Sequence, residues 1–499
     1  MSQPPSYGPS PDQRPPQIWD TGLRPPRPPS EAPGFGPPPP AFGPPADGPG
    51  LPGDGGGPPR RGGAGARRTA LIITLALALV AGLGTAGWLL LAGGEDRPEG
   101  APLPRHRTAS KIAWDEPVPT LEDGVQPTSG TWFTDRYVAK ALPNKVVAYD
   151  LASGDRAWTV PLDGVVCATS TEAVAGRAAV QHGEGCRKLT VIDLEKKREL
   201  WTDELHDPTD PENFSEGELA LSEKLVVLAS GSGSAAYRID NKKKVYRDRG
   251  YLGDCSLSAA AGAESGKTLL VVASCGEAGG RQVWALDPET ARRKNVWDVP
   301  DNLDVTNILS TSPPVIALQS QQAESVEYIL RLRPGNRKPT KISVGEKGQY
   351  LCANDSPRCA DIVVTDDTVY LSGPTHDSYG DGATLMNEVV AYDLGTGKSK
   401  RLLEPDNKRE LEPFAALDGD LIAYEPPTEE KGGVLLRYDA ETGKRSVYER
   451  HPDWSSERES AIEQDTVPLL HRGMFFLAAE EIYSREEGES PKPLIAAFR

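Results

Sequence analysis

The residues of this sequence with the clearest chemistry are its six cysteines, all of which lie in the last two thirds of the chain. Residues that face each other across an antiparallel hairpin have a constant sum of residue numbers, so the turn lies at their midpoint. Pairing in sequence order places these midpoints at 176–177, at 265 and within 354–357, which are all turn-like segments. Six free thiols, as expected in a reducing compartment, are the alternative. Among the 15 possible connectivities, we predict the disulfides Cys167–Cys186, Cys255–Cys275 and Cys352–Cys359.

The spacing of the other reactive residues does not match familiar catalytic or metal-binding motifs. The cysteines form no Cys-x-x-Cys pair, and none of their spacings fits a zinc site. No His-x-His, His-Glu-x-x-His or Gly-x-Ser-x-Gly arrangement occurs. We therefore predict no catalytic residue, no metal ligand and no cofactor-binding residue. The scattered histidines are His106, His182, His206, His376, His451 and His471.

Two acidic segments are the remaining candidates for binding loops. Residues 376–382 contain Asp377 and Asp381, whose carboxylates are calcium-type ligands, but the full alternation of oxygen ligands is missing. Residues 206–212 are similarly acidic. A plain solvated loop is the alternative for both segments. If the scaffold beneath them is rigid, such loops are where binding residues commonly lie.

The elements that would position these segments follow from an internal repeat. A sequence motif of the form Ala-x-Asp-x-x-Ser/Thr-Gly, followed by an aromatic residue, recurs along the chain. Its clearest copy lies at residues 148–158. Successive copies are 43, 47, 47, 46, 60, 46 and 60 residues apart. A period in the forties, with four short strands in each unit, is typical of a β-propeller. The copies centre on Asp150, Asp193, Asp240, Asp287, Arg333, Asp393, Asp439 and Arg499.

Each copy predicts the third strand of a blade and the turn that follows it. The aspartate carboxylate accepts backbone N–H groups in that turn, and the glycine adopts the left-handed backbone that the turn requires. The aromatic residue that follows is expected to pack between blades, with a cofactor role as the alternative; these residues are Trp158, Trp201, Tyr246, Trp297 and Tyr448. The predicted third strands are 145–151, 188–194, 235–240, 282–287, 328–333, 388–394, 434–439 and 493–498.

The two ends of the repeat region are expected to meet. The chain ends directly after the eighth third strand, while residues 111–119 resemble the outer strand at 156–162. We predict that this N-terminal strand completes the eighth blade, since an open ring would expose edge strands to aggregation. The fold class is therefore all-β, an eight-bladed β-propeller. Seven blades is the alternative, because the fifth copy has Arg333-Pro334-Gly335 in place of the aspartate turn.

This motif resembles the PQQ-like repeat, which is found in quinoprotein dehydrogenases and in the propeller lipoprotein of the outer-membrane barrel-assembly machinery. The resemblance extends over residues 111–499 and is best around Asp150, Asp287, Asp393 and Asp439. It implies an eight-bladed propeller, but its members have unrelated functions. The dehydrogenases hold PQQ beneath a disulfide between adjacent cysteines, near a bound calcium ion. No Cys-Cys pair occurs here, so the resemblance does not extend to that cofactor site.

The N-terminal part has a different composition. Residues 1–68 are rich in Pro, Gly, Ala and Arg, and such a segment cannot bury enough apolar surface to fold. Residues 69–92 carry no charge and would span roughly 36 Å as a helix. We predict a disordered tail (1–68), one transmembrane helix (69–92), a linker (93–110) and the propeller (111–499). The spacing of Ala78, Gly82 and Ala86 fits a helix-packing face, although chance explains it in so Ala- and Gly-rich a segment.

Flanking charges predict the orientation of this helix. Arg60, Arg61, Arg67 and Arg68 precede it, and Glu95 and Asp96 follow it. The positive-inside rule then keeps the tail in the cytoplasm and the propeller outside the plasma membrane. A cleaved signal peptide or a twin-arginine export signal is the alternative. An oxidising outer compartment agrees with the predicted disulfides.

Charge and motif content together favour a binding protein. The whole chain carries −17 and residues 1–68 carry +2, so the remainder carries −19. Nucleic acid requires a basic surface, so it is excluded as a partner. We predict a non-catalytic module that binds or scaffolds an envelope or secreted protein and contacts lipid only through its helix. The alternatives are an extracytoplasmic enzyme, either a divergent quinoprotein or a hydrolase with its site in the central channel, and a sensor that signals to the tail.

Overall fold

The computed structural model describes residues 108–499 apart from 122–123, 207–213, 248–254, 264, 277–279, 321–324, 336, 346–358, 360–361, 378–384, 407–408, 462–465 and 485–491. The chain divides into two units, 1–96 and 97–499, and every described residue belongs to the second. The predicted tail (1–68), transmembrane helix (69–92) and most of the linker (93–110) lie outside the described residues. Within the described ranges, no helix has the length and apolar character needed to cross a bilayer.

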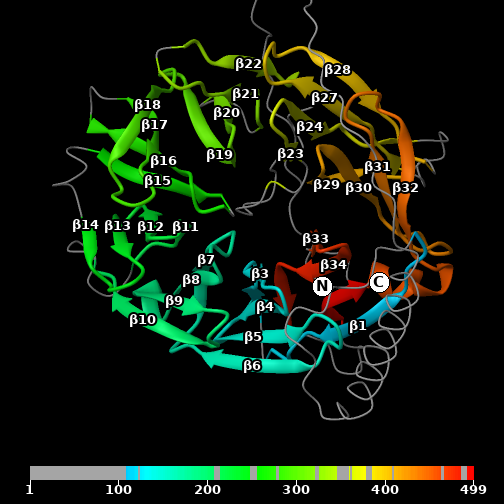
Figure 1. The fold of residues 1–499 in the computed structure, drawn as a ribbon, viewed down its shortest axis with the longest axis horizontal. Coiled ribbons are helices and arrows are strands. Elements are labelled where there is room, and N and C mark those ends of the chain that lie inside the picture. The colour runs from blue at the N-terminus through cyan, green and yellow to red at the C-terminus, as the bar shows by residue number, and fades with distance from the viewer. Residues whose placement is uncertain are drawn as a thin grey trace, which may run out of the picture. The chain divides into compact units, whose positions relative to one another are not determined.

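The described part of the chain forms eight four-stranded antiparallel sheets arranged side by side in a ring (Figure 1). From the innermost strand outward, the first four blades consist of β3 (Thr131–Phe133), β4 (Tyr137–Leu142), β5 (Lys145–Asp150) and β6 (Arg156–Pro161); β7 (Val166–Thr169), β8 (Arg177–His182), β9 (Lys188–Asp193) and β10 (Arg198–Glu204); β11 (Gly217–Leu221), β12 (Leu225–Ser230), β13 (Gly233–Arg238) and β14 (Lys244–Arg247); and β15 (Cys255–Gly262), β16 (Leu269–Cys275), β17 (Arg281–Leu286) and β18 (Arg293–Asp298).

The last four blades keep the same order. They consist of β19 (Leu303–Thr311), β20 (Pro314–Ser320), β21 (Tyr328–Arg331) and β22 (Thr340–Ser343); β23 (Ile362–Val364), β24 (Thr368–Ser372), β27 (Val389–Asp393) and β28 (Ser399–Leu403); β29 (Glu412–Leu417), β30 (Asp420–Glu425), β31 (Val434–Tyr438) and β32 (Arg445–Arg450); and β33 (Thr466–His471), β34 (Met474–Ala479), β36 (Pro493–Phe498) and β1 (Ile112–Pro117). The predicted eight blades are confirmed, and the seven-bladed alternative is wrong. All eight predicted third strands are present, each within two residues of its expected bounds.

The eighth blade closes the ring as predicted. Its outer strand β1 pairs antiparallel with β36, with Ile112 opposite Phe498. Backbone hydrogen bonds between Lys111 and Arg499 continue this pairing to the last residue of the chain. Because β1 and β36 lie at opposite ends of the sequence, ring closure joins residues that are distant along the chain.

The turns at Asp150, Asp193, Asp287, Asp393 and Asp439 have the predicted geometry. The prediction for Asp240 is wrong, because Arg238 occupies the corresponding position at the end of β13. Asp150 Oδ1 accepts from the backbone N–H of Ala152 at 3.0 Å and of Ser153 at 3.3 Å. Asp287 makes the equivalent bonds, and a hydrogen bond from Lys294 together with those in its own turn holds the pKa of its carboxyl well below the usual range. Gly154 follows with φ +77°. The turn depends on one carboxylate that satisfies several N–H donors at once.

The outer-strand tryptophans join neighbouring blades, as predicted. Trp201 Nε1 donates to the carbonyl of Ile239 in the next blade at 2.8 Å, and Trp297 Nε1 to that of Arg333 at 2.7 Å. Trp114, on the N-terminal strand β1, donates to Leu151 at 3.1 Å. The core lies between the faces of successive blades, since one buried cluster contains residues of the first and second blades and another those of the third and fourth.

Candidate functional site

The two sides of the ring differ in the connections they carry. On one side, here called the turn side, lie the connections from first to second strand and from third to fourth strand of each blade. The other, here called the loop side, carries the connections from second to third strand and from each blade to the next. Turn-side connections range from short ones such as 417–420 to the longer 331–340, whereas loop-side connections range from 230–233 to the much longer 343–362, 372–389 and 450–466. The variable segments of the chain are therefore concentrated on the loop side.

Both disulfides of the described residues lie at the loop side. Cys255 and Cys275 face each other directly in the register of β15 and β16 and are bonded, as predicted. Cys167 and Cys186 are also bonded, which confirms the predicted pairing. Their predicted cross-strand geometry is wrong, because Cys167 lies at a bulge of β7 while Cys186 lies beyond the end of β8, in the 3₁₀ turn η1 (Glu184–Cys186). The bulge and the turn bring the two cysteines together, although they are not paired in the register of β7 and β8.

The third predicted disulfide is only partly described. Cys359 is disulfide-bonded and lies in the loop-side connection 343–362, whereas Cys352 lies outside the described residues. The pairing of these two residues therefore stays a prediction. Every described cysteine lies in a loop-side connection or near the end of a strand that leads into one.

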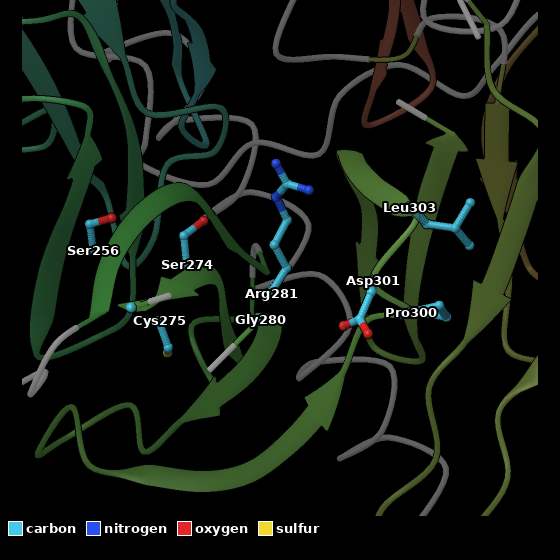
Figure 2. Close-up of a pocket in the computed structure, with 9 residues that line it drawn as sticks. Ser256, Ser274, Cys275, Gly280, Arg281, Pro300, Asp301 and Leu303 are labelled. Carbon is cyan, nitrogen blue, oxygen red and sulfur yellow. The ribbon is translucent and has the colours of Figure 1, made fainter. Parts of the chain in front are cut away.

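A pocket of about 450 Å³ lies at the loop side beside the Cys255–Cys275 bridge. Figure 2 shows the side chain of Arg281 between Ser256 and Ser274 on one side and Asp301, Pro300 and Leu303 on the other. Arg281 forms an ion pair with Asp304 of β19, which fixes its guanidinium between two blades. Its lining combines polar side chains with Pro300 and Leu303, and the polar ones present hydrogen-bonding groups to the loop side.

A second pocket of about 410 Å³ lies beside the Cys167–Cys186 bridge. Its lining includes Glu184, Arg187 and Glu204, and Lys188 forms an ion pair with Asp163 across its edge. Both pockets thus adjoin a disulfide-linked connection of the same side. A covalent link beside each hollow limits the movement of the loops that shape it.

Charge also distinguishes the two sides. On the turn side, the exposed residues of the described connections are of mixed sign: Asp135, Arg136, Asp155, Glu195, Lys196, Lys197, Glu223, Lys224, Asp240, Lys242, Lys243, Lys267, Glu289, Arg292, Arg337, Lys338, Asp366, Asp367, Lys398, Asp418, Asp439, Glu441, Lys444 and Arg472. On the loop side, the exposed acidic residues are Asp163, Glu184, Glu216, Asp301, Glu404, Asp406, Glu429, Glu430, Asp453, Glu457 and Glu481. The only exposed Lys or Arg in the described loop-side connections is Lys431. The exposed residues of the described connections therefore carry a net negative charge on the loop side and nearly balanced charge on the turn side.

Exposed apolar side chains favour the loop side as well. Seven large hydrophobic residues are exposed among those described, and five lie in loop-side connections: Val125, Val165, Leu385, Trp454 and Tyr483. The other two, Val296 and Leu402, lie on outer strands. Val125 and Tyr483 face each other in a two-stranded sheet formed by β2 (Val125–Pro127) and β35 (Glu481–Tyr483). Trp454 is the most exposed of the seven, at 71%.

The candidate acidic segments have modest local structure. His376 and Asp377 form the short strand β25 (His376–Asp377), which pairs with β26 (Leu385–Met386), and His376 Nε2 lies 3.0 Å from Glu388 Oε1. Asp381 and residues 207–212 lie outside the described residues. Within the described ranges, no group of three or more His, Cys, Asp or Glu side chains is arranged to hold a metal ion. Calcium binding by Asp377 and Asp381 stays a hypothesis.

The segment that carries Trp454 is anchored by a buried charged cluster. Trp454 belongs to the 3₁₀ turn η3 (Asp453–Ser455), which leads into the short helix α4 (Ser456–Ser460). From this helix, the fully buried Glu459 accepts from His451 Nδ1 at 2.9 Å and from the backbone N–H of Gly433 at 2.9 Å. Tyr424 and Ser455 donate to the same carboxylate. Sequence analysis missed this cluster, because its members come from β30 and from two separate connections and form no linear motif.

His451 makes the stability of this segment depend on pH. Burial alone would lower the pKa of its imidazole, but hydrogen bonds and charge from Glu449 and Glu459 together outweigh burial and raise the pKa. Since the folded-state pKa exceeds the unfolded value, the stabilisation is complete below about pH 6.5 and is lost as pH rises through the folded pKa. We expect the difference in free energy of unfolding between wild type and His451→Gln to shrink from about pH 6 to about pH 9. Urea titrations at each pH measure it, and a constant difference would contradict the assignment.

A family model matches the first repeats of the propeller. Residues 96–248 match the family model described as outer membrane protein assembly factor BamB. The chain carries the PQQ-like repeat. Solved structures similar to it include BamB from Moraxella catarrhalis (12% identity, 77% of this chain and 100% of that chain, TM-score 0.42), the hydrazine synthase of Kuenenia stuttgartiensis (11%, 66% and 96%, 0.37) and the Pan2 WD40 domain of Neurospora crassa (10%, 75% and 89%, 0.38). No curated protein matches the chain.

The disulfides of this PQQ-like propeller should contribute measurably to its stability. Cys255 and Cys275 are 20 residues apart, and a loop of that length predicts a stabilisation of about 3 kcal/mol. We expect the double variant Cys255→Ser, Cys275→Ser to lose about that much free energy of unfolding. The double variant Ser256→Ala, Ser274→Ala changes the neighbouring opposed pair and should remain within about 0.5 kcal/mol of wild type. Equal stability of the two variants would show that the bridge adds nothing.

Proposed function

We propose that this chain is a membrane-tethered, extracytoplasmic PQQ-like propeller that binds or scaffolds another envelope protein through its loop side, without catalysis. The observation that carries the proposal is the coincidence of four features on that side. The described disulfides, the two pockets, the long connections and the net negative charge of the exposed residues all lie there. A rigid ring that holds variable loops on one side is the arrangement expected of a binding scaffold.

The tether and the compartment in this proposal rest on the sequence. An uncharged stretch at 69–92, with arginines before it and acidic residues after it, supports a single-pass helix with the tail in the cytoplasm. The bonded state of Cys167, Cys186, Cys255 and Cys275 supports an oxidising environment for the propeller. In intact cells, a membrane-impermeant amine reagent should label the exposed Lys431. Labelling only after the cells are broken open would contradict the proposed location.

Site-specific photo-crosslinking in intact cells tests the binding function. Glu184 and Glu195 are exposed glutamates of the second blade, on the loop side and the turn side respectively. Glu429 and Glu441 form the same contrast in the seventh blade. A photoreactive residue at Glu184 or Glu429 should give a discrete adduct with a second protein, while the same residue at Glu195 or Glu441 should give none. Adducts of equal yield from both sides, or from neither, would reject the proposal.

A further inference from the structure

We infer that the loop side recognises a protein segment that combines basic side chains with an apolar residue, and that Trp454 is its apolar contact. This inference rests on the proposed function and adds the chemistry of the partner. The side chain of Trp454 is unusually exposed for a tryptophan. The large indole of Trp454 is 71% exposed, whereas Trp132 and Trp284 are fully buried in the blades.

Trp454 is held on a rigid base. Its neighbour Ser455 is buried and donates to the carbonyl of Pro452 at 2.7 Å. One turn later, Glu459 joins the segment to β30 and to the connection before β31. Arg458 forms an ion pair with Asp115 of β1, which ties the segment to the closing strand. Because the backbone beneath it is fixed, the indole can contact a partner with little loss of conformational entropy.

The charges around Trp454 select the kind of partner. Asp453 and Glu457 lie within three residues of it and are exposed. The two nearby arginines, in contrast, are paired with carboxylates, Arg450 with Asp406 and Arg458 with Asp115. On the neighbouring connection of the eighth blade, Glu481 is exposed next to the half-exposed Tyr483. The exposed residues of the described loop side thus combine apolar groups with an almost purely acidic surround. Lys or Arg side chains beside an apolar residue are the groups that this surface complements.

The same charges exclude the other occupants of such a surface. An anionic bilayer or a nucleic acid would bring phosphates against carboxylates, and like-charge contact is unfavourable. A second copy of this chain, docked through the same side, would bring two acidic sides together. A protein segment with basic and apolar side chains is the occupant that can pack against the indole and also pair with the carboxylates.

A binding measurement with the full chain, purified in neutral detergent, tests this inference. The probe is a fluorescent peptide of alternating lysine and leucine, and the comparison probes are its glutamate–leucine and lysine–serine analogues. We expect only the lysine–leucine peptide to bind firmly. Binding should weaken when salt rises from about 0.1 M to about 1 M, since the Debye length falls from about 10 Å to about 3 Å.

Variants then locate the contact. Trp454→Ala, and separately the pair Asp453→Lys and Glu457→Lys, should each weaken binding by about tenfold or more, as expected for a central aromatic or charged contact. Leu402→Ala removes an exposed hydrophobic side chain from an outer strand, and the pair Asp366→Lys and Glu441→Lys changes the turn side by the same charge. Both controls should stay within about twofold of wild type.

Two results would overturn the inference. One is that control and loop-side variants weaken binding equally, and the other is that the glutamate–leucine peptide or anionic vesicles bind as well as the lysine–leucine peptide. These results are distinguishable from failure of the proposed function. If photo-crosslinking from Glu184 or Glu429 succeeds while Trp454→Ala and the charge reversals have no effect on the peptide, the binding function stands and the basic–apolar partner is rejected.

Discussion

Replacing Trp114 with alanine is expected to lower the free energy of unfolding by about 3–5 kcal/mol. Trp114 lies on β1 and is 8% exposed, in a cluster with residues of the first and eighth blades. Its indole N–H donates to Leu151, and its ring lies 6.2 Å from that of Phe476. The substitution therefore removes packing and one hydrogen bond at the point where the ring closes, and urea or thermal unfolding measures the loss.

The packing of Trp114 at the ring closure leaves no space for a side chain at Gly154. A Cβ atom at Gly154 would lie 2.6 Å from Cγ of Trp114, so an alanine there would collide with the indole. Gly335 has a similar φ of +70°, with nothing within 4 Å of the added Cβ. Both alanine variants suffer backbone strain of about 1–2 kcal/mol, but Gly154→Ala should lose at least about 1 kcal/mol more than Gly335→Ala through the collision.

The control for Trp114 is another tryptophan. Trp454→Ala removes the same side chain from an exposed position, so its free energy of unfolding should stay within about 0.5 kcal/mol of wild type. In the background of Trp114→Ala, the extra loss caused by Gly154→Ala should shrink without disappearing, because the ring atoms are gone but Cβ of residue 114, 2.8 Å from the added atom, remains. A loss for Trp114→Ala no larger than that for Trp454→Ala would contradict the role of β1 in closure.

Replacing Glu459 with alanine is expected to destabilise the chain by about 3 kcal/mol, since it removes one of the two carboxylates that face the buried His451 and the acceptor of a buried backbone N–H. Glu459 is fully buried and accepts from His451, from the backbone of Gly433 and from Tyr424. Without the carboxylate, these donors remain buried without their acceptor. Urea unfolding below about pH 6.5 gives the largest difference, because the raised pKa of His451 favours the imidazolium there.

The matched control for Glu459 lies on the same helix. Glu457 is exposed, so Glu457→Ala should change the free energy of unfolding by less than about 0.5 kcal/mol. Because Glu459 anchors the segment that carries Trp454, Glu459→Ala should also increase the fluorescence quenching and proteolysis of that segment below the unfolding transition. If the two glutamate variants are equally stable, the buried cluster is not an anchor.

Much of the scaffold was predictable, because each blade is specified locally. The Asp150 turn, its glycine and the tryptophan that follows lie within one short stretch, and their spacing reveals the third strand, the turn and the outer strand together. Copies of that stretch gave all eight third strands and the closing role of residues 111–119. The fifth blade shows the limit of the motif: its turn lacks the aspartate, yet Gly335 still adopts the left-handed backbone there.

The disulfides show the same division between local and tertiary information. Cys255 and Cys275 obey the constant register of a hairpin, so their pairing and geometry were both predictable. Cys167 and Cys186 pair as expected, but a bulge in β7 and the turn η1 position them. A bulge changes the register by one residue, and a sequence pattern of period two does not reveal it.

What the sequence determined by itself is the repeat: its period, its strands, its turns and the meeting of its two ends. Only the tertiary structure decided that the described disulfides and the exposed Trp454 share one side, that the exposed basic residues of the described connections gather on the other side, and that Glu459 lies against His451. The reason is geometric. Strands that alternate in direction send every second connection to the same side of the ring, so residues from different blades become neighbours only after the blades have stacked.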